Sequence, residues 1–206
     1  MRSERGVCVV AWIFLLFAGV AAAAPASDAE LVAALQRGGN VIYFRHADTG
    51  PASPDPPTAD LTRCETQRNL NDNGRAQAQD IGRQFRRLRI PVGAVLSSQF
   101  CRCKETAQLA FGRFEVVPTL TGVARGPELA QARRSASEGL RVLLSTVPPE
   151  GENTVLVSHG FNLIDLEGLY LSTQGEAAIY QSDGAGGYSL FARVLPSQWS
   201  GLPATE

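Results

Sequence analysis

The sequence predicts an α/β protein, built as a single three-layer α/β/α domain around a mainly parallel sheet. Two short apolar runs at residues 41–44 and 154–157 are typical of strands that are buried on both faces, and a further strand is expected at residues 92–96. Helical patterns of apolar residues separate these runs, and this alternation of strand and helix favours parallel pairing. The chain shows no internal repeat and no linker-like stretch, so we expect one domain.

The first half of the chain predicts two helices on either side of the first strand. Ser27 and Glu30 have the spacing of a capping box and begin the first helix. Residues 51–57 contain four prolines and predict a loop. A long amphipathic helix then begins at Asn71 or Asp72, either of which can cap it.

The second half alternates in the same way and ends in a hairpin. The turn-rich stretch before the last apolar run indicates that the final two strands are antiparallel. The expected elements are a helix at 106–111, a short strand at 115–117, helices at 127–144 and 161–171, and hairpin strands at 177–181 and 188–194.

The first 26 residues have the pattern of a secretory signal. A basic start is followed by an apolar run over residues 7–20 and then by small residues suited to cleavage after Ala23 or Ala26. The apolar run is too short for a membrane span, although an uncleaved anchor is the alternative. We expect residues 1–26 to be a signal peptide, 27–206 to be the working domain, and the protein to be exported, to the periplasm in a bacterial cell.

Composition excludes some classes of function. The formal net charge is −1, which is unlike a nucleic-acid-binding domain. The chain has only two histidines, and its cysteines do not have the spacing of a zinc site, so we expect no structural metal and no cofactor. Nothing in the pattern indicates an oligomeric state.

The two histidines are the most informative residues. His46 comes directly after the strand at 41–44, and His159 comes directly after the strand at 154–157. Open α/β sheets bind their ligands at the carboxyl ends of their strands, so both side chains are predicted at one site. The alternative is that each is a structural histidine with no ligand.

Four sequence blocks resemble the histidine phosphatase superfamily, the phosphoglycerate mutase-like proteins of the branch 1 type. These blocks are Arg45-His46-Ala47, Leu70 to Ala78, Ser97 to Arg102 followed by Thr106-Ala107, and Ser158-His159-Gly160. They occur in the family's order. The resemblance implies a phosphoglycerate mutase-like fold, a small phosphorylated substrate, and metal-independent phosphoryl transfer through a phosphohistidine.

The resemblance also implies a role for each site residue. His46 is the expected nucleophile, and it attacks as a neutral imidazole whose second nitrogen donates to a fixed acceptor. Arg45 and Arg102 are expected to grip phosphate oxygens with their planar guanidinium groups. His159, when protonated, would add charge, with backbone N–H groups of the following helix aimed at the same anion. Thr49 is also expected to bind phosphate. The alternative for Arg102 is a surface arginine without a role in the site, and the alternative for Thr49 is a solvated loop residue.

The acid that protonates the leaving group is not assigned by this comparison. Glu128, Glu176 and Asp60 are candidates, and none is preferred. A substrate with a good leaving group, or a phosphohistidine substrate, has less need of such an acid.

The expected function is hydrolysis of a phosphomonoester, with a sugar phosphate as one candidate. The acid phosphatase and phytase branch fits poorly, because its motifs need an arginine at Thr49 and an aspartate at Gly160. Among smaller exported relatives, the heptose-phosphate phosphatases are the nearest analogy, which leaves the natural substrate open. The alternative is a phosphate- or sugar-phosphate-binding protein of the same fold that has lost turnover.

Three cysteines follow the signal segment, and in an oxidising compartment they allow one disulfide. A link between Cys101 and Cys103 would close a very short ring, so Cys64 is expected to be a partner. We choose Cys64–Cys101, with Cys64–Cys103 as the open alternative. Cysteines at similar places in exported relatives, as the resemblance implies, favour such a bridge.

Overall fold

The computed structural model describes residues 27–51, 55–56, 59–122 and 129–204, so the signal segment and Glu128 lie outside the described residues. Its strands are β1 (Asn40–Arg45), β2 (Val92–Ser97), β3 (Glu115–Val116), β4 (Asn153–Ser158), β5 (Ala177–Ser182) and β6 (Tyr188–Val194). Its α-helices are α1 (Asp28–Arg37), α2 (Asp72–Arg87), α3 (Cys101–Phe111), α4 (Ala130–Ser145) and α5 (Ile164–Glu167). Short 3₁₀ turns are η1 (Cys64–Thr66), η2 (Pro118–Thr121) and η4 (Trp199–Gly201).

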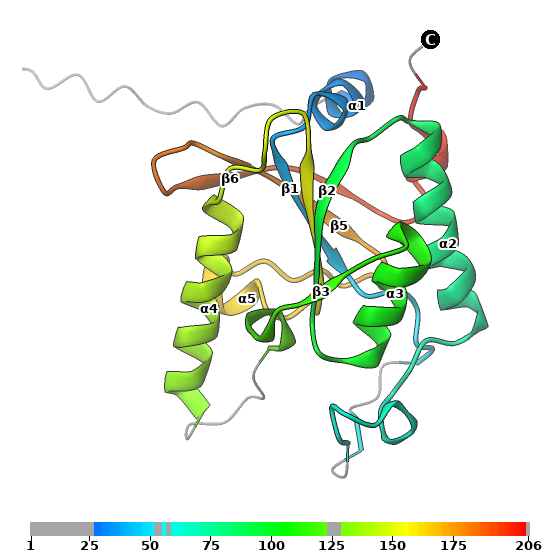
Figure 1. Cartoon of the computed structure of the whole chain (residues 1–206), viewed down its shortest axis with the longest axis vertical. Helices are drawn as coiled ribbons and strands as arrows, with labels where there is room; N and C mark the ends of the chain where they lie inside the picture. The colour runs from blue at the N-terminus through cyan, green and yellow to red at the C-terminus, as the bar shows by residue number, and fades with distance from the viewer. Residues whose placement is uncertain (1–26, 52–54, 57–58, 123–128, 205–206) are drawn as a thin grey trace, which may run out of the picture.

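The strands form one six-stranded sheet in the order β3-β2-β4-β1-β5-β6. The pairs β2–β3, β2–β4 and β1–β4 are parallel, whereas β5 and β6 form the predicted antiparallel hairpin at one edge. Figure 1 shows α1, α2 and α3 on one face of the sheet and α4 and α5 on the other. The three-layer α/β/α prediction is therefore confirmed.

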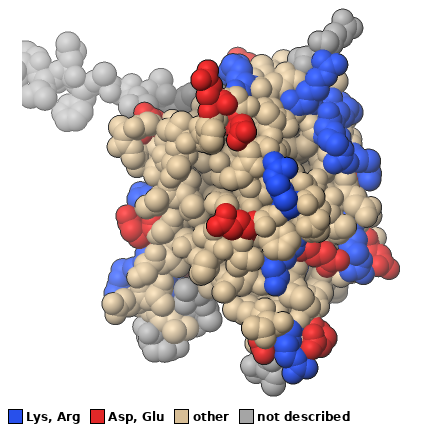
Figure 2. All heavy atoms as spheres, in the orientation of Figure 1, with Lys and Arg blue, Asp and Glu red and all other residues tan. Residues whose placement is uncertain are grey.

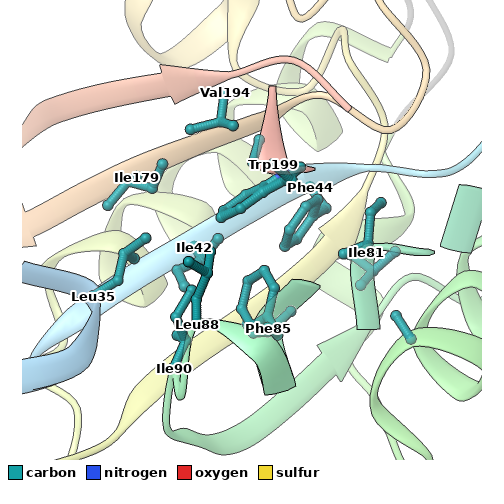
Figure 3. Packing of buried hydrophobic residues seen from close by; sticks show 14 of the residues in the cluster. Leu35, Ile42, Phe44, Ile81, Phe85, Leu88, Ile90, Ile179, Val194 and Trp199 are labelled. Atoms are coloured by element: carbon teal, nitrogen blue, oxygen red, sulfur yellow. The ribbon is translucent and has the colours of Figure 1, made fainter. Parts of the chain in front are cut away.

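The larger core lies between the sheet and helices α1 to α3. Phe44 projects from β1 into an aromatic cluster with Phe85 of α2 and Trp199 of η4, at ring-centroid distances of 5.9 and 6.1 Å (Figure 3). Burying such large rings contributes several kcal/mol of hydrophobic stabilisation. The opposite face is sealed by Leu140 and Leu144 of α4, which pack with Tyr43 and other buried residues.

The helix α2 begins where the sequence predicts, and its start packs against the loop that follows β1. The side chain of Asn71 caps the helix by accepting from the backbone N–H of Gly74 at 2.7 Å. A Cβ at Gly74 would lie 1.9 Å from the carbonyl oxygen of Asp48, so only glycine permits this approach. The contact fixes the loop that carries His46.

The helix α3 begins five residues earlier than the predicted helix at 106–111. No side chain next to its start caps it; instead the Oε1 of Gln67, from a distant loop, accepts from the N–H of Cys101 at 2.9 Å. Because this cap is a tertiary contact, the local sequence did not signal it. The longer helix places Arg102 in its first turn.

The helix predicted over 161–171 is reduced to the four-residue α5. Asn162 bonds with its side chain to the carbonyl of Leu120 and the hydroxyl of Ser158, which holds the chain in a turn instead. Gly168, with φ of 73°, ends the helix. The expected row of helical N–H groups directly after His159 is therefore wrong, since α5 starts only at Ile164.

The surface of the molecule carries charges of both signs. Figure 2 shows basic side chains gathered over α2, where Arg83, Arg86 and Arg87 are all exposed, and mixed charges elsewhere on this face. Among the described helices, none has the length and apolar character needed to cross a membrane.

Candidate active site

The two histidines lie side by side because of the register between β1 and β4. Arg45, the last residue of β1, pairs with Ser158, the last residue of β4. The N–H of His46 then extends this ladder by donating to the carbonyl of Ser158 at 2.9 Å. The rings of His46 and His159 consequently meet edge to face, with centroids 5.6 Å apart. The structure thus brings together the two residues that the sequence predicts at one site.

The backbone fixes the tautomer of His46. Its Nδ1 lies 2.8 Å from the carbonyl oxygen of Ala47, and a carbonyl can only accept, so Nδ1 carries the proton. The Nε2 atom is left with a lone pair. The pKa of His46 is lowered to about 3, first by burial and then by the charge of the nearby Arg102 guanidinium. The hydrogen bond to Ala47 raises the pKa, but by less than Arg102 lowers it. The ring is therefore a neutral imidazole at ordinary pH, as a nucleophile requires.

His159 is held as a neutral ring in the free protein. Its Nε2 lies 3.0 Å from the hydroxyl of Ser98, and its Nδ1 lies 3.5 Å from Nη2 of Arg102, which can only donate. The ring is buried between Phe100 and Phe161. Burial, and then the charge of Arg102, hold the pKa of His159 well below its usual range. The charged form of His159, which would add positive charge to the site, is therefore disfavoured in the free protein, and an incoming anion would favour it.

Arg45 is buried beneath the segment that follows α5. Its Nη1 donates to the carbonyls of Leu171 and Ser172, and its guanidinium carbon lies 5.9 Å from the ring centroid of Tyr170. These contacts use one end of the planar group. The side chain is anchored at the carboxyl end of β1, next to His46.

Arg102 is buried in the site and is not the surface residue of the alternative reading. Only 3% of its surface is exposed, and its guanidinium stacks on Phe100 at 4.1 Å. Its Nη1 donates to Oδ1 of Asp55 at 2.9 Å, while its Nη2 faces His159. Arg102 therefore joins the loop after β1 to the second histidine.

Two residues of the site were missed from the sequence. Asp55 occupies the predicted proline-rich loop and forms the ion pair with Arg102. Arg68 lies next to it, and its positive charge helps to lower the pKa of both His46 and His159. Neither residue belongs to a strand end or a motif, so only the tertiary contacts reveal them.

The other predicted site residues have partners elsewhere. The hydroxyl of Thr49 donates to Oε1 of Gln174 at 2.8 Å, so its phosphate-binding role stays a prediction. Glu176 is buried in an ion pair with Arg193, and the carboxylate of Asp60 accepts from Thr62. Neither carboxylate has a contact with the two histidines. The leaving-group acid is thus not found among the candidates that the structure describes.

The disulfide joins Cys64 and Cys101, as chosen from the sequence, with Cα atoms 5.6 Å apart. It fastens the segment carrying Asp55 and Arg68 to the first turn of α3, which carries Arg102. Cys103 is free and buried, and burial raises the pKa of its thiol to about 12. Among the described residues, no group of histidine, cysteine and acidic side chains could hold a metal ion.

A family model confirms what this geometry indicates. Residues 41–122 match the model for the histidine phosphatase superfamily, branch 1, over the part of the chain that runs from β1 through η2. This part of the chain is therefore similar to the histidine phosphatase superfamily, branch 1. A search of curated proteins returned no match.

Several solved phosphatase structures share the fold. The protein histidine phosphatase SixA in complex with tungstate is similar with a TM-score of 0.53 and 20% identity, over 77% of this chain and 98% of that one. Phosphoserine phosphatase from Entamoeba histolytica is similar with a TM-score of 0.53 and 18% identity, over 75% of this chain and 95% of that one. The alpha-ribazole phosphatase from Shigella flexneri has a TM-score of 0.50 and 20% identity, over 77% of this chain and 96% of that one. At these identities the likeness establishes the architecture only.

Proposed function

We propose that this chain is an exported, metal-independent phosphatase that hydrolyses a phosphomonoester through a phosphohistidine at His46. The observation that carries the proposal is the Nδ1 of His46 bonded to the carbonyl of Ala47, with Nε2 left as a lone pair. Arg45, Arg68 and Arg102 surround this nucleophile with positive charge. Such an arrangement suits the oxygens of a phosphoryl group.

The reaction would proceed in two displacements. First, Nε2 of His46 forms a bond to phosphorus as the ester P–O bond breaks, and the leaving oxygen takes a proton from solvent. Water then attacks phosphorus, the P–N bond breaks, and inorganic phosphate leaves. The phosphorylated ring is cationic, and its Nδ1–H donates to Ala47, which stabilises the intermediate. Arg102 and Arg45 offset the negative charge on the phosphoryl oxygens.

Aromatic side chains beside the histidines favour a substrate with a ring. Phe161 stacks on His159 with centroids 5.5 Å apart, yet 37% of its surface is exposed. Tyr170, beside the guanidinium of Arg45, is 48% exposed. Exposed aromatic faces pack well against the apolar face of a sugar. A sugar phosphate is therefore the substrate class that we propose.

One assay tests this function. Purified protein lacking residues 1–26 is incubated with p-nitrophenyl phosphate in the presence of EDTA, and released phosphate is counted over many turnovers. Sustained release supports a metal-independent phosphatase. Activity that disappears with EDTA refutes the metal independence, and phosphate binding without turnover supports the alternative, a binding protein of this fold.

A further inference from the structure

We infer that Arg68 is a third phosphate-binding arginine of this site, whose guanidinium takes an oxygen of the phosphoryl group beside Arg45 and Arg102. This inference rests on the proposed function and adds a residue to it. No sequence block that resembles the superfamily includes Arg68.

The backbone of Arg68 contacts both members of the Asp55–Arg102 ion pair. Its N–H donates to Oδ1 of Asp55 at 3.0 Å, and its carbonyl accepts from Nη1 of Arg102 at 3.4 Å. The guanidinium of Arg102 in turn reaches the ring of His159. Arg102 thus contacts both Arg68 and His159, and in this chain of contacts it links Arg68 to the histidine pair.

The side chain of Arg68 has hydrogen-bonding capacity that the protein leaves unused. The residue is half-buried, and its Nε is buried with no hydrogen-bond partner among the residues that the structure describes. A buried N–H of a charged group without an acceptor is costly, so its presence points to an acceptor supplied by a ligand. The nearest carboxylate, Asp55, is already used by Arg102 and by the backbone of Arg68.

The balance of charge indicates what that ligand is. Arg45, Arg68 and Arg102 bring three positive charges, and Asp55 brings one negative charge, while both histidines are neutral. The resulting excess of two positive charges matches a phosphomonoester dianion. Burial, followed by repulsion from Arg102, lowers the pKa of Arg68, and an incoming dianion would relieve that repulsion.

The disulfide and η1 hold Arg68 in position. Cys64 bonds covalently to Cys101, next to Arg102 in the chain, and Gln67 caps the same helix turn through Cys101. Arg68 therefore enters the site from a segment fixed to α3 at two points. A segment fixed in this way needs little backbone ordering when its arginine binds an anion.

Calorimetric titration with inorganic phosphate tests the inference. Arg68→Met should weaken phosphate binding on the order of 10- to 100-fold, the loss expected for a charged hydrogen-bonding pair. Arg63→Met is the matched control, because Arg63 lies on the same loop with an exposed side chain paired to Glu65, and its binding should equal that of the wild type.

A second, conservative variant, Arg68→Lys, tests the inference if Arg68→Met does not fold. Arg68→Lys keeps the charge but loses the planar fork, so it should bind phosphate about 3- to 10-fold more weakly. Wild-type affinity in a folded Arg68→Met protein overturns the inference, as does wild-type affinity in Arg68→Lys. If the wild type binds phosphate but does not turn over p-nitrophenyl phosphate, the proposed function fails while the role of Arg68 is still decided by these titrations.

Discussion

Both histidines of the site are neutral in the folded protein, and their lowered pKa values make the stability of the protein depend on pH. His46 has a folded pKa of about 3, against about 6.5 for a free histidine, because its ring is buried near positive charges. Between these values the unfolded chain binds more protons than the folded one. The stabilisation from His46 is therefore complete above pH 6.5 and is lost as the pH falls toward 3.

Urea unfolding at pH 7.5 and pH 5.0 measures this effect. The wild type should lose about 2 kcal/mol more stability over this interval than His46→Gln, whose side chain does not titrate. Equal losses in the two proteins would show that His46 has an ordinary pKa in the folded state. His159 contributes with the same sign in both proteins, so the difference between them reports mainly on His46.

The sequence was most informative about residues that follow strands directly. His46 and His159 could be placed together because β1 and β4 are parallel and their ends meet. Arg45 was assigned from the motif that it forms with His46 and Ala47. Asp55 and Arg68 could not be found in this way. Their roles depend on contacts between a loop and the first turn of α3, and such contacts have no periodicity or motif that would mark them.

At the scale of elements, the disulfide joins the loop around η1 to α3. It closes a loop with a sequence separation of 37, and the chain-entropy model then gives about 4 kcal/mol of stabilisation before strain. Its loss should also release the segment that carries Asp55 and Arg68. We therefore expect an effect on both stability and substrate binding.

The double variant Cys64→Ala/Cys101→Ala tests this prediction. It should unfold at lower urea concentration than the wild type and show a raised KM for p-nitrophenyl phosphate. A thiol reductant should shift the urea midpoint and the KM of the wild type toward those of the variant, and it should leave both values of the variant unchanged. If the wild type shows Cys64 as a free thiol in non-reduced peptide maps, the bridge does not form in solution.

The boundaries of the elements show where local reasoning stops. The start of α2 was predicted because Asn71 caps it locally. The start of α3 was not predicted, because the side chain that caps it, Gln67, comes from a distant loop. The shortening of α5 was not predicted, because the side chain of Asn162 bonds to the distant carbonyl of Leu120 and holds the chain in a turn. In each case a tertiary hydrogen bond outweighed the apolar pattern.

At the scale of the whole molecule, strand and helix alternation was sufficient to predict the layered fold. The two apolar clusters on opposite faces of the sheet follow from the all-apolar runs of β1 and β4. The export signal is a further whole-chain prediction, and it lies in residues that the structure does not describe.

Processing of the signal can be measured on the full chain expressed in a bacterium. The protein should be recovered in the periplasmic fraction, and its intact mass should correspond to a start at Ala24 or Ser27, with one disulfide formed. Full-length protein in the membrane fraction would indicate an uncleaved anchor instead. Full-length protein in the cytoplasm would refute export altogether.

The covalent intermediate at His46 is the centre of the account, and rapid quenching during turnover of p-nitrophenyl phosphate tests it directly. Mass spectrometry should find an acid-labile, base-stable phosphoryl adduct on His46. His46→Ala should abolish both adduct and turnover, whereas His159→Ala should lower turnover by about 10²- to 10³-fold and still label His46. An adduct on His159, or near-normal turnover by His46→Ala, would contradict the account.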